Sequence, residues 1–234
     1  MRDYFTLDGK NSIDFNTWIA TSNMFDGAEH DDESVEIPGR NGAIIMSNNR
    51  YRNFSGSVSC YIPYDMRHNV DALRSFLSSK HQYCRYEDSM HPEVYLMARY
   101  IGGFTLSDSD RVGAAFDLAF DCKPQKFLKS GEAPIAYTAN GLIYNPTDYA
   151  SKPLIRCYGS SGTVTVGGVS VTVSGASAFA DINCELMEVY ENGTSLNSTT
   201  TLTNGEFPVI NSGEVAISFT GFTSIEITPH WFMI

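Results

Sequence analysis

Four side chains of metal-ligating type lie close together near the middle of the first half of the chain. They are His81, Cys84, Asp88 and His91. Zinc sites take their Cys and His ligands at short, regular intervals, and the His-x2-Cys-x6-His spacing here is not one of them. Asp88 and the His91-Pro92 step are instead typical of a turn. The sequence therefore predicts no metal centre and no bound cofactor.

The common motifs of hydrolases and nucleotide-binding proteins do not occur in the sequence. It contains no Gly-x-Ser-x-Gly, no His-Glu-x-x-His and no glycine-rich loop ending in Gly-Lys-Ser or Gly-Lys-Thr. Carboxylate pairs suited to glycoside cleavage are set about 5 to 10 Å apart by the fold, so the sequence neither places nor excludes such a pair. We predict no catalytic residue and a protein that is not an enzyme.

Aromatic residues of the second half are candidates for contacts with glycans, because sugar rings stack on flat aromatic faces. Alternating tyrosines also pack in the core or at the rim of small β-sandwiches, and this half has only Lys152 and Arg156 as cations. A carbohydrate-binding module for cell-wall glycans is therefore the alternative function. The candidates are Tyr144, Tyr149, Tyr158, Tyr190 and Trp231, with Tyr158, Tyr190 and Trp231 as the selected stacking residues.

The charge of the chain argues against nucleic acids and anionic membranes as partners. The 234 residues include 16 Lys and Arg against 27 Asp and Glu, a net charge of −11. Residues 131–234 contribute 2 − 9 = −7 of this, too few cations to neutralise a run of phosphates. No apolar run approaches the roughly eighteen residues of a membrane-spanning helix. We expect no sequence-specific nucleic-acid binding and no membrane insertion.

The cysteines and the N-terminus predict synthesis in a reducing cytoplasm. The sequence has 5 Cys without a Cys-x-x-Cys pair, a pattern that predicts buried free thiols. The first residues alternate in polarity and contain no apolar signal segment.

The first half is predicted to be an antiparallel sheet or sandwich that carries one helix. An acidic segment, 26–36, is interpreted as a solvated loop. It leads into a sharp turn, where Pro fixes φ and glycines permit positive φ. The turn residues are Pro38, Gly39, Arg40 and Gly42.

Hydrophobic periodicity defines the other elements of this half. A helix is predicted over 66–79, because one face of it would hold Val70, Leu73, Phe76 and Leu77. Asp65 is the candidate N-cap. Period-2 patterns predict strands in 51–61, 93–101 and 114–121.

The second half is predicted to be a small all-β sandwich. Breakers are dense in 123–152, where regular structure should end, and we place the domain boundary near residue 130, giving domains 1–130 and 131–234. Two alternating runs around Gly167-Gly168 predict a hairpin. Further strands are expected in 180–190, 215–219 and 224–228, and the segment 194–203 is interpreted as a loop.

Several motifs in this order resemble the distal tail (Dit) protein family of long-tailed siphophages. The first is Ile37-Pro38-Gly39-Arg40-Asn41-Gly42, followed by the single helix and the run from Phe116 to Phe127. The Gly167-Gly168 hairpin and the closing Ile227-Thr228-Pro229-His230-Trp231 follow the family's C-terminal order. The sequence departs from the family pattern at Glu214 and His230, where Asn and Arg are common.

The resemblance implies a structural virion protein at the phage tail tip, mainly β, with an N-terminal sandwich-like domain and a C-terminal galectin-like β-sandwich. The N-terminal domain would form a homo-oligomer, a hexameric ring whose lumen lets DNA pass. The ring would join the tail tube protein to the tail-associated lysin or fibre hub protein. It would also provide a platform for receptor-binding proteins.

Overall fold

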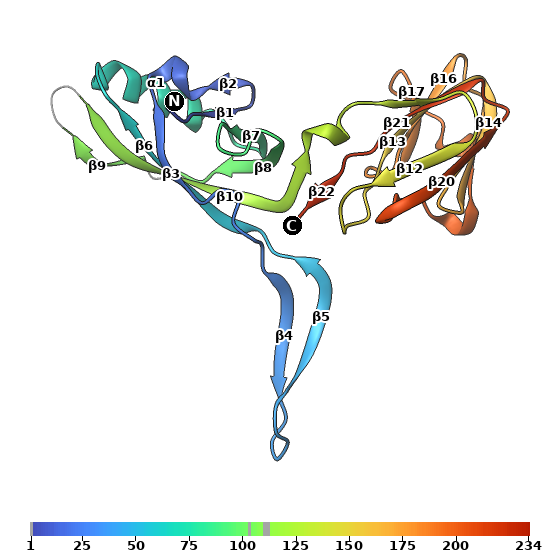
Figure 1. The fold of residues 1–234 in the computed structure, drawn as a ribbon, viewed down its shortest axis with the longest axis horizontal. Helices are drawn as coiled ribbons and strands as arrows, with labels where there is room; N and C mark the ends of the chain where they lie inside the picture. The colour runs from blue at the N-terminus through green and yellow to red at the C-terminus, as the bar shows by residue number, and fades with distance from the viewer. Residues whose placement is uncertain (1, 103, 110–112) are drawn as a thin grey trace. The chain divides into compact units, whose positions relative to one another are not determined.

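The computed structural model describes residues 2–102, 104–109 and 113–234 of the chain (Figure 1). The protein is mainly β, with several antiparallel sheets and one α-helix in the described residues. The chain divides into two compact units, Met1–Lys126 together with Ile234, and Phe127–Met233. Each unit has its own hydrophobic core.

The first unit is built on one antiparallel sheet with the order β2-β1-β7-β8-β10-β6-β3, and β9 also pairs with β10. Strand β10 pairs with β6 over nine residues, from Ala114↔Ile62 to Cys122↔Phe54. The strands are β1 (Phe5–Leu7), β2 (Lys10–Asn11), β3 (Trp18–Ser22), β6 (Phe54–Ile62), β7 (Cys84–Asp88), β8 (Val94–Tyr100), β9 (Thr105–Ser109) and β10 (Ala114–Leu128).

Helix α1 (Met66–Ser78) contributes to the core of this unit, as its periodicity predicts. Its residues Val70, Leu73 and Leu77 are buried in the same cluster as Phe116 and Phe120 of β10. Strand alternation places the intervening residues of β10 on the opposite face of the sheet. Asp65 occupies the predicted N-cap position, but it has a left-handed conformation and its side chain makes no capping bond.

The second unit is a sandwich of two antiparallel sheets, ordered β11-β21-β13-β16-β17-β18 and β12-β20-β14-β15-β19. The strands of the first sheet are β11 (Ile135–Tyr137), β13 (Leu154–Tyr158), β16 (Phe179–Asn183), β17 (Glu188–Glu191), β18 (Thr194–Ser195) and β21 (Ser224–Thr228). The second sheet contains β12 (Gly141–Asn145), β14 (Ser161–Val166), β15 (Val169–Ser174), β19 (Thr200–Leu202) and β20 (Gly213–Thr220). The last strand, β22 (Phe232–Met233), belongs to neither of these sheets and pairs with β10.

The hairpin predicted at Gly167-Gly168 is confirmed. Strands β14 and β15 pair in register from Ser161↔Ser174 to Val166↔Val169. Both turn glycines have positive φ, 59° and 87°, which the two-residue turn requires. The inward-facing valines of β14 and β15 belong to the core between the two sheets.

Two sequence predictions about irregular segments are wrong. The acidic segment 26–36 contains strand β4 (His30–Glu36), which pairs with β5 (Ala43–Tyr51). The breaker-rich segment 123–152 contains the end of β10 as well as β11 and β12. Pro124 is tolerated in β10 because the pairing with β6 ends at Cys122, so no ladder bond to β6 is lost there.

The second half differs from its prediction at two further places. The run 180–190 forms two strands, β16 and β17, because the Asn183 Oδ1 atom accepts bonds from the N–H groups of Glu185 and Leu186 and organises a turn. The segment 194–203 contains the short strands β18 and β19 rather than a continuous loop.

Candidate functional site

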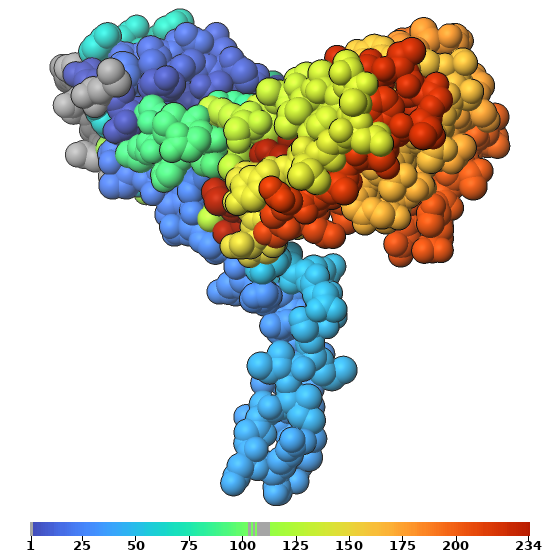
Figure 2. Space-filling model, turned by 45° about the vertical axis from the view of Figure 1, so that its right-hand side comes forward, coloured from blue at the N-terminus to red at the C-terminus, as the bar shows by residue number. Residues whose placement is uncertain are grey.

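Strands β4 and β5 form a two-stranded ribbon of their own, which we call the arm (Figure 1). Its register runs from His30↔Tyr51 to Glu36↔Ala43. Most side chains on both strands are exposed (Figure 2). Isolated two-stranded hairpins are marginally stable in water, so an arm that buries neither face is suited to contact another surface.

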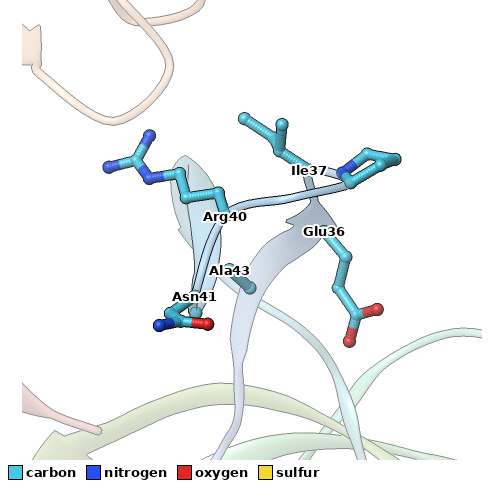
Figure 3. A pocket seen from close by; sticks show the side chains of 7 residues that line it. Glu36, Ile37, Arg40, Asn41 and Ala43 are labelled. Atoms are coloured by element: carbon cyan, nitrogen blue, oxygen red, sulfur yellow. The ribbon is translucent and has the colours of Figure 1, made fainter.

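The connection between β4 and β5 contains the four predicted turn residues. Gly39 and Gly42 have φ of 83° and 82°, and the Arg40 N–H donates to the carbonyl of Ile37 at 3.1 Å. The turn surrounds a shallow pocket, beside which the Arg40 and Glu36 side chains point in different directions (Figure 3). Pro38 also lines this pocket. The turn thus presents both charges at the end of the arm.

The arm also presents large apolar side chains to solvent. Ile45 and Met46 are 69% and 59% exposed, and Ile37 and Ile44 about 40%. Ile44 and Ile45 project from opposite faces of β5 because strand side chains alternate. Exposed apolar strands promote pairing with other chains unless a partner covers them. We call these four residues the arm apolar group.

A buried carboxylate joins the two strands at the base of the arm. Asp31 lies at a register shift in β4 and is 7% exposed. It accepts hydrogen bonds from the Nε atoms of Arg50 at 2.5 Å and Arg52 at 2.6 Å, and from Asn48 at 3.3 Å. The bonds from Arg50 and Arg52 lower the pKa of Asp31 to about 2. All three donors come from β5 or the residue that follows it. Asp31 therefore holds the base of β4 against the base of β5.

We predict that protonation of Asp31 loosens the base of the arm. Because the folded-state pKa is lowered, the stabilisation is fully present above the ordinary value of 3.8 and is lost as pH falls through about 2. Asp31→Asn should reproduce the loosened state at pH 6, where tryptic cleavage after Arg50 and Arg52 becomes several-fold faster. Asp32→Asn, an exposed neighbour, is the matched control. Equal cleavage of both variants would contradict this role.

Two of the three selected stacking residues share one face of a sheet. Tyr158 and Tyr190 lie on the outward face of the six-stranded sheet, whereas Trp231 is 4% exposed and belongs to the core. Trp231 is therefore unavailable for stacking. Tyr144 is exposed on the other sheet, and Tyr149 stacks on Phe232.

Two of the four side chains of metal-ligating type, Asp88 and His91, contact each other. Asp88 accepts a bond from the His91 N–H at 2.8 Å, and its Oδ1 atom lies 3.1 Å from Nδ1 of the same residue. Across the described residues, no group of three His, Cys, Asp or Glu side chains is placed to hold a metal ion. All five cysteines are free thiols. Cys84 is half-buried and the other four are buried.

Comparison with known proteins gives a match at the level of the fold. No family model and no curated protein sequence matches the chain. The crystal structure of the Dit protein (gp 19.1) of phage SPP1 superposes with a TM-score of 0.78, covering 100% of both chains at 13% sequence identity. The chain has the fold of a phage Dit protein. The SPP1 protein is a paradigm of hub adsorption apparatus in phages that infect Gram-positive bacteria.

The Dit fold confirms the fold class predicted from the sequence, because the match includes both units. No helix in the described ranges is long and apolar enough to cross a bilayer. The identity of 13% leaves residue roles to be argued from this chain alone.

Sequence reasoning missed the three ion pairs that organise these surfaces, two at Asp31 and one at Asp181. Asp31 was placed in a solvated loop, so its pairing with Arg50 and Arg52 could not be foreseen. Arg156 pairs with Asp181 through two bonds. Asp31 and Arg156 both lie outside the strands predicted from the sequence, so no predicted strand pairing could bring either residue to its partner.

Proposed function

We propose that the chain is the hub protein of a siphophage tail tip, a structural virion component without catalytic activity. The observation that carries this proposal is the match to the SPP1 Dit protein over the full length of both chains. A partial match would support only a shared domain. Here the match covers 100% of this chain, both of its units included, and 100% of the SPP1 chain.

In this proposal six copies form a ring at the distal end of the tail. The ring joins the tail tube protein to the tail-associated lysin or fibre hub protein, and receptor-binding proteins dock on it. Its copies are made in the cytoplasm of the bacterial host and function in the virion. The cationic content is low, and six copies carry 6 × −11 = −66 charges, so DNA would pass through without being held.

The arm supports self-association as the basis of the ring. Its apolar group is exposed in a single copy, and covering it would remove apolar surface from water. The turn of Pro38, Gly39, Arg40 and Gly42 forms the end of this arm, and we propose that it sets the shape with which the arm meets a neighbouring copy. A stable contact between copies should bury about 1,200 to 2,000 Å² in total.

Native mass in solution tests the ring directly. Light scattering of the purified chain should give a species near 6 × 25.8 ≈ 155 kDa, and negative-stain images of the same fraction should show six-fold rings. The same measurement with added tail tube protein covers a ring that needs a template. A monomer in both experiments would overturn the proposal.

A further inference from the structure

Five side chains gather on the outward face of the six-stranded sheet in the second unit. Cross-strand pairing places Arg156 beside Asp181 and Asp181 beside Tyr190, while Tyr158 lies beside Phe179. Their strand neighbours, such as Cys157, Ala180 and Val189, point into the core. We call the five outward residues the aromatic platform.

The charged pair at the centre of the platform is held rigidly. Both Asp181 oxygens accept from Arg156, Oδ1 from Nε at 2.7 Å and Oδ2 from Nη2 at 2.8 Å. The guanidinium also lies over the Phe179 ring, 4.6 Å from its centroid. Asp181 is only 4% exposed although it belongs to an outward face. A guanidinium has five N–H donors, so donors remain available to a ligand after this pairing.

A second buried carboxylate fixes the edge of the platform. Glu191 is 9% exposed and accepts bonds from the backbone N–H groups of Ser177 and Ala178, each at 2.8 Å. A longer bond of 3.4 Å comes from the N–H of Phe179 itself. The loop that leads into Phe179 is therefore tied to strand β17. The platform is preorganised, which lowers the entropic cost of binding.

The surface chemistry favours a sugar over a protein partner. The strongly exposed large apolar residues that unit 2 offers, such as Leu142, Tyr144, Leu186 and Met187, all lie outside the platform. What the platform offers instead is half-buried aromatic rings around an oriented guanidinium and carboxylate. Aromatic faces contact the C–H faces of sugar rings, and the charged pair can exchange hydrogen bonds with hydroxyl groups.

The spacing and charge of the platform narrow the ligand further. Tyr158 and Tyr190 lie two strands apart, about 10 Å across the sheet. This exceeds the spacing of two neighbouring sugar rings, so a ligand that contacts both must contain at least three rings. Glu226 lies opposite Arg156 in the register of β13 and β21, and residues 131–234 carry a net charge of −7 (2 − 9). This acidic surrounding disfavours anionic polymers.

We propose that the aromatic platform binds a neutral oligosaccharide of three or more rings, such as a segment of a cell-wall glycan. This function is independent of ring formation and goes beyond the proposed hub role. Tyr158 and Tyr190 stack on two sugar rings that are separated by one further ring, and Arg156, which shares a strand with Tyr158 and is level with Tyr190, donates to hydroxyl groups of the rings beside it. The platform would give the tail tip a weak contact with the cell surface, multiplied by the number of copies present.

Titration calorimetry and saturation-transfer NMR on the full chain test this proposal. The probes are cellotetraose and the tetramer of N-acetylglucosamine, with tetragalacturonate as an anionic comparison. Tyr158→Ala and Tyr190→Ala should each weaken binding of a neutral probe about tenfold. Arg156→Lys keeps the charge and removes the paired geometry, and should also weaken binding.

Tyr144→Ala is the matched control, because Tyr144 is 64% exposed on the other sheet. Its affinity should equal that of the unaltered protein, and all four variants should keep the same mass by light scattering. The proposal is overturned if neither neutral probe binds at millimolar concentration or if tetragalacturonate binds best. It is also overturned if Tyr144→Ala weakens binding as much as Tyr190→Ala.

Discussion

Replacing Ile45 with Asp and Met46 with Lys is expected to convert the proposed ring into folded monomers of 25.8 kDa. Both side chains belong to the arm apolar group and are 69% and 59% exposed in the single copy. If a neighbouring copy covers them, each substitution places a charge against a desolvated surface. Residues at the centre of an interface often contribute more than a tenfold change in affinity each, so the pair should weaken association at least about a hundredfold.

Sedimentation velocity and light scattering measure this loss, and far-UV circular dichroism shows whether the variant is folded. The matched control is Leu186→Asp with Met187→Lys. These two residues lie in the turn between β16 and β17 and are 66% and 67% exposed, so the same chemistry is changed at equal exposure outside the arm. Dissociation of the control, or an intact ring in the arm variant, would contradict a role of the arm in assembly.

Elements with one buried face could be predicted from the sequence. The helix over 66–79 was predicted from Val70, Leu73 and Leu77, and these residues are buried in α1, which ends at Ser78. The strand 224–228 coincides with β21 because Ile225 and Ile227 alternate with outward residues. In both cases the hydrophobic period records which face meets the core.

Strand β4 could not be predicted in this way because almost none of its side chains is buried. Its carboxylates read as a solvated loop, although the backbone pairs with β5. The candidate sites share this limit. Asp31 with Arg50, and Arg156 with Asp181, meet only through strand pairing over 19 and 25 positions. Neither distance in sequence leaves a periodic signal.

Glycines present the same problem, and one of them leads to the second prediction with a large effect. Gly221 lies in the turn that connects β20 in one sheet to β21 in the other. Its φ is +83°, and a Cβ atom placed there would lie 2.8 Å from both the Gly162 Cα and the Ser161 carbonyl oxygen. Both neighbours are backbone atoms, so they cannot rotate away. Phe222 follows Gly221 and is buried at the end of the sandwich core.

Gly221→Ala is therefore expected to destabilise the second unit severely. The left-handed conformation costs about 1–2 kcal/mol for a residue with a Cβ atom. The steric conflict with β14 adds about 1–3 kcal/mol, as for other overpacked sites. A total of about 2–5 kcal/mol should lower the melting temperature of a unit of this size by roughly 10 °C or more. Differential scanning calorimetry would resolve this loss as a shift of the second unit's transition.

Gly193→Ala separates the steric conflict from the backbone strain. Gly193 has nearly the same φ, +80°, but no atom lies within 4 Å of a Cβ atom built there. It should therefore cost only the conformational strain, about 1–2 kcal/mol. Equal melting temperatures for the two variants would mean that β14 yields at Gly162 without loss. A much lower value for Gly221→Ala would show that the close approach of two backbones, rather than φ alone, makes glycine necessary where the chain crosses between the sheets.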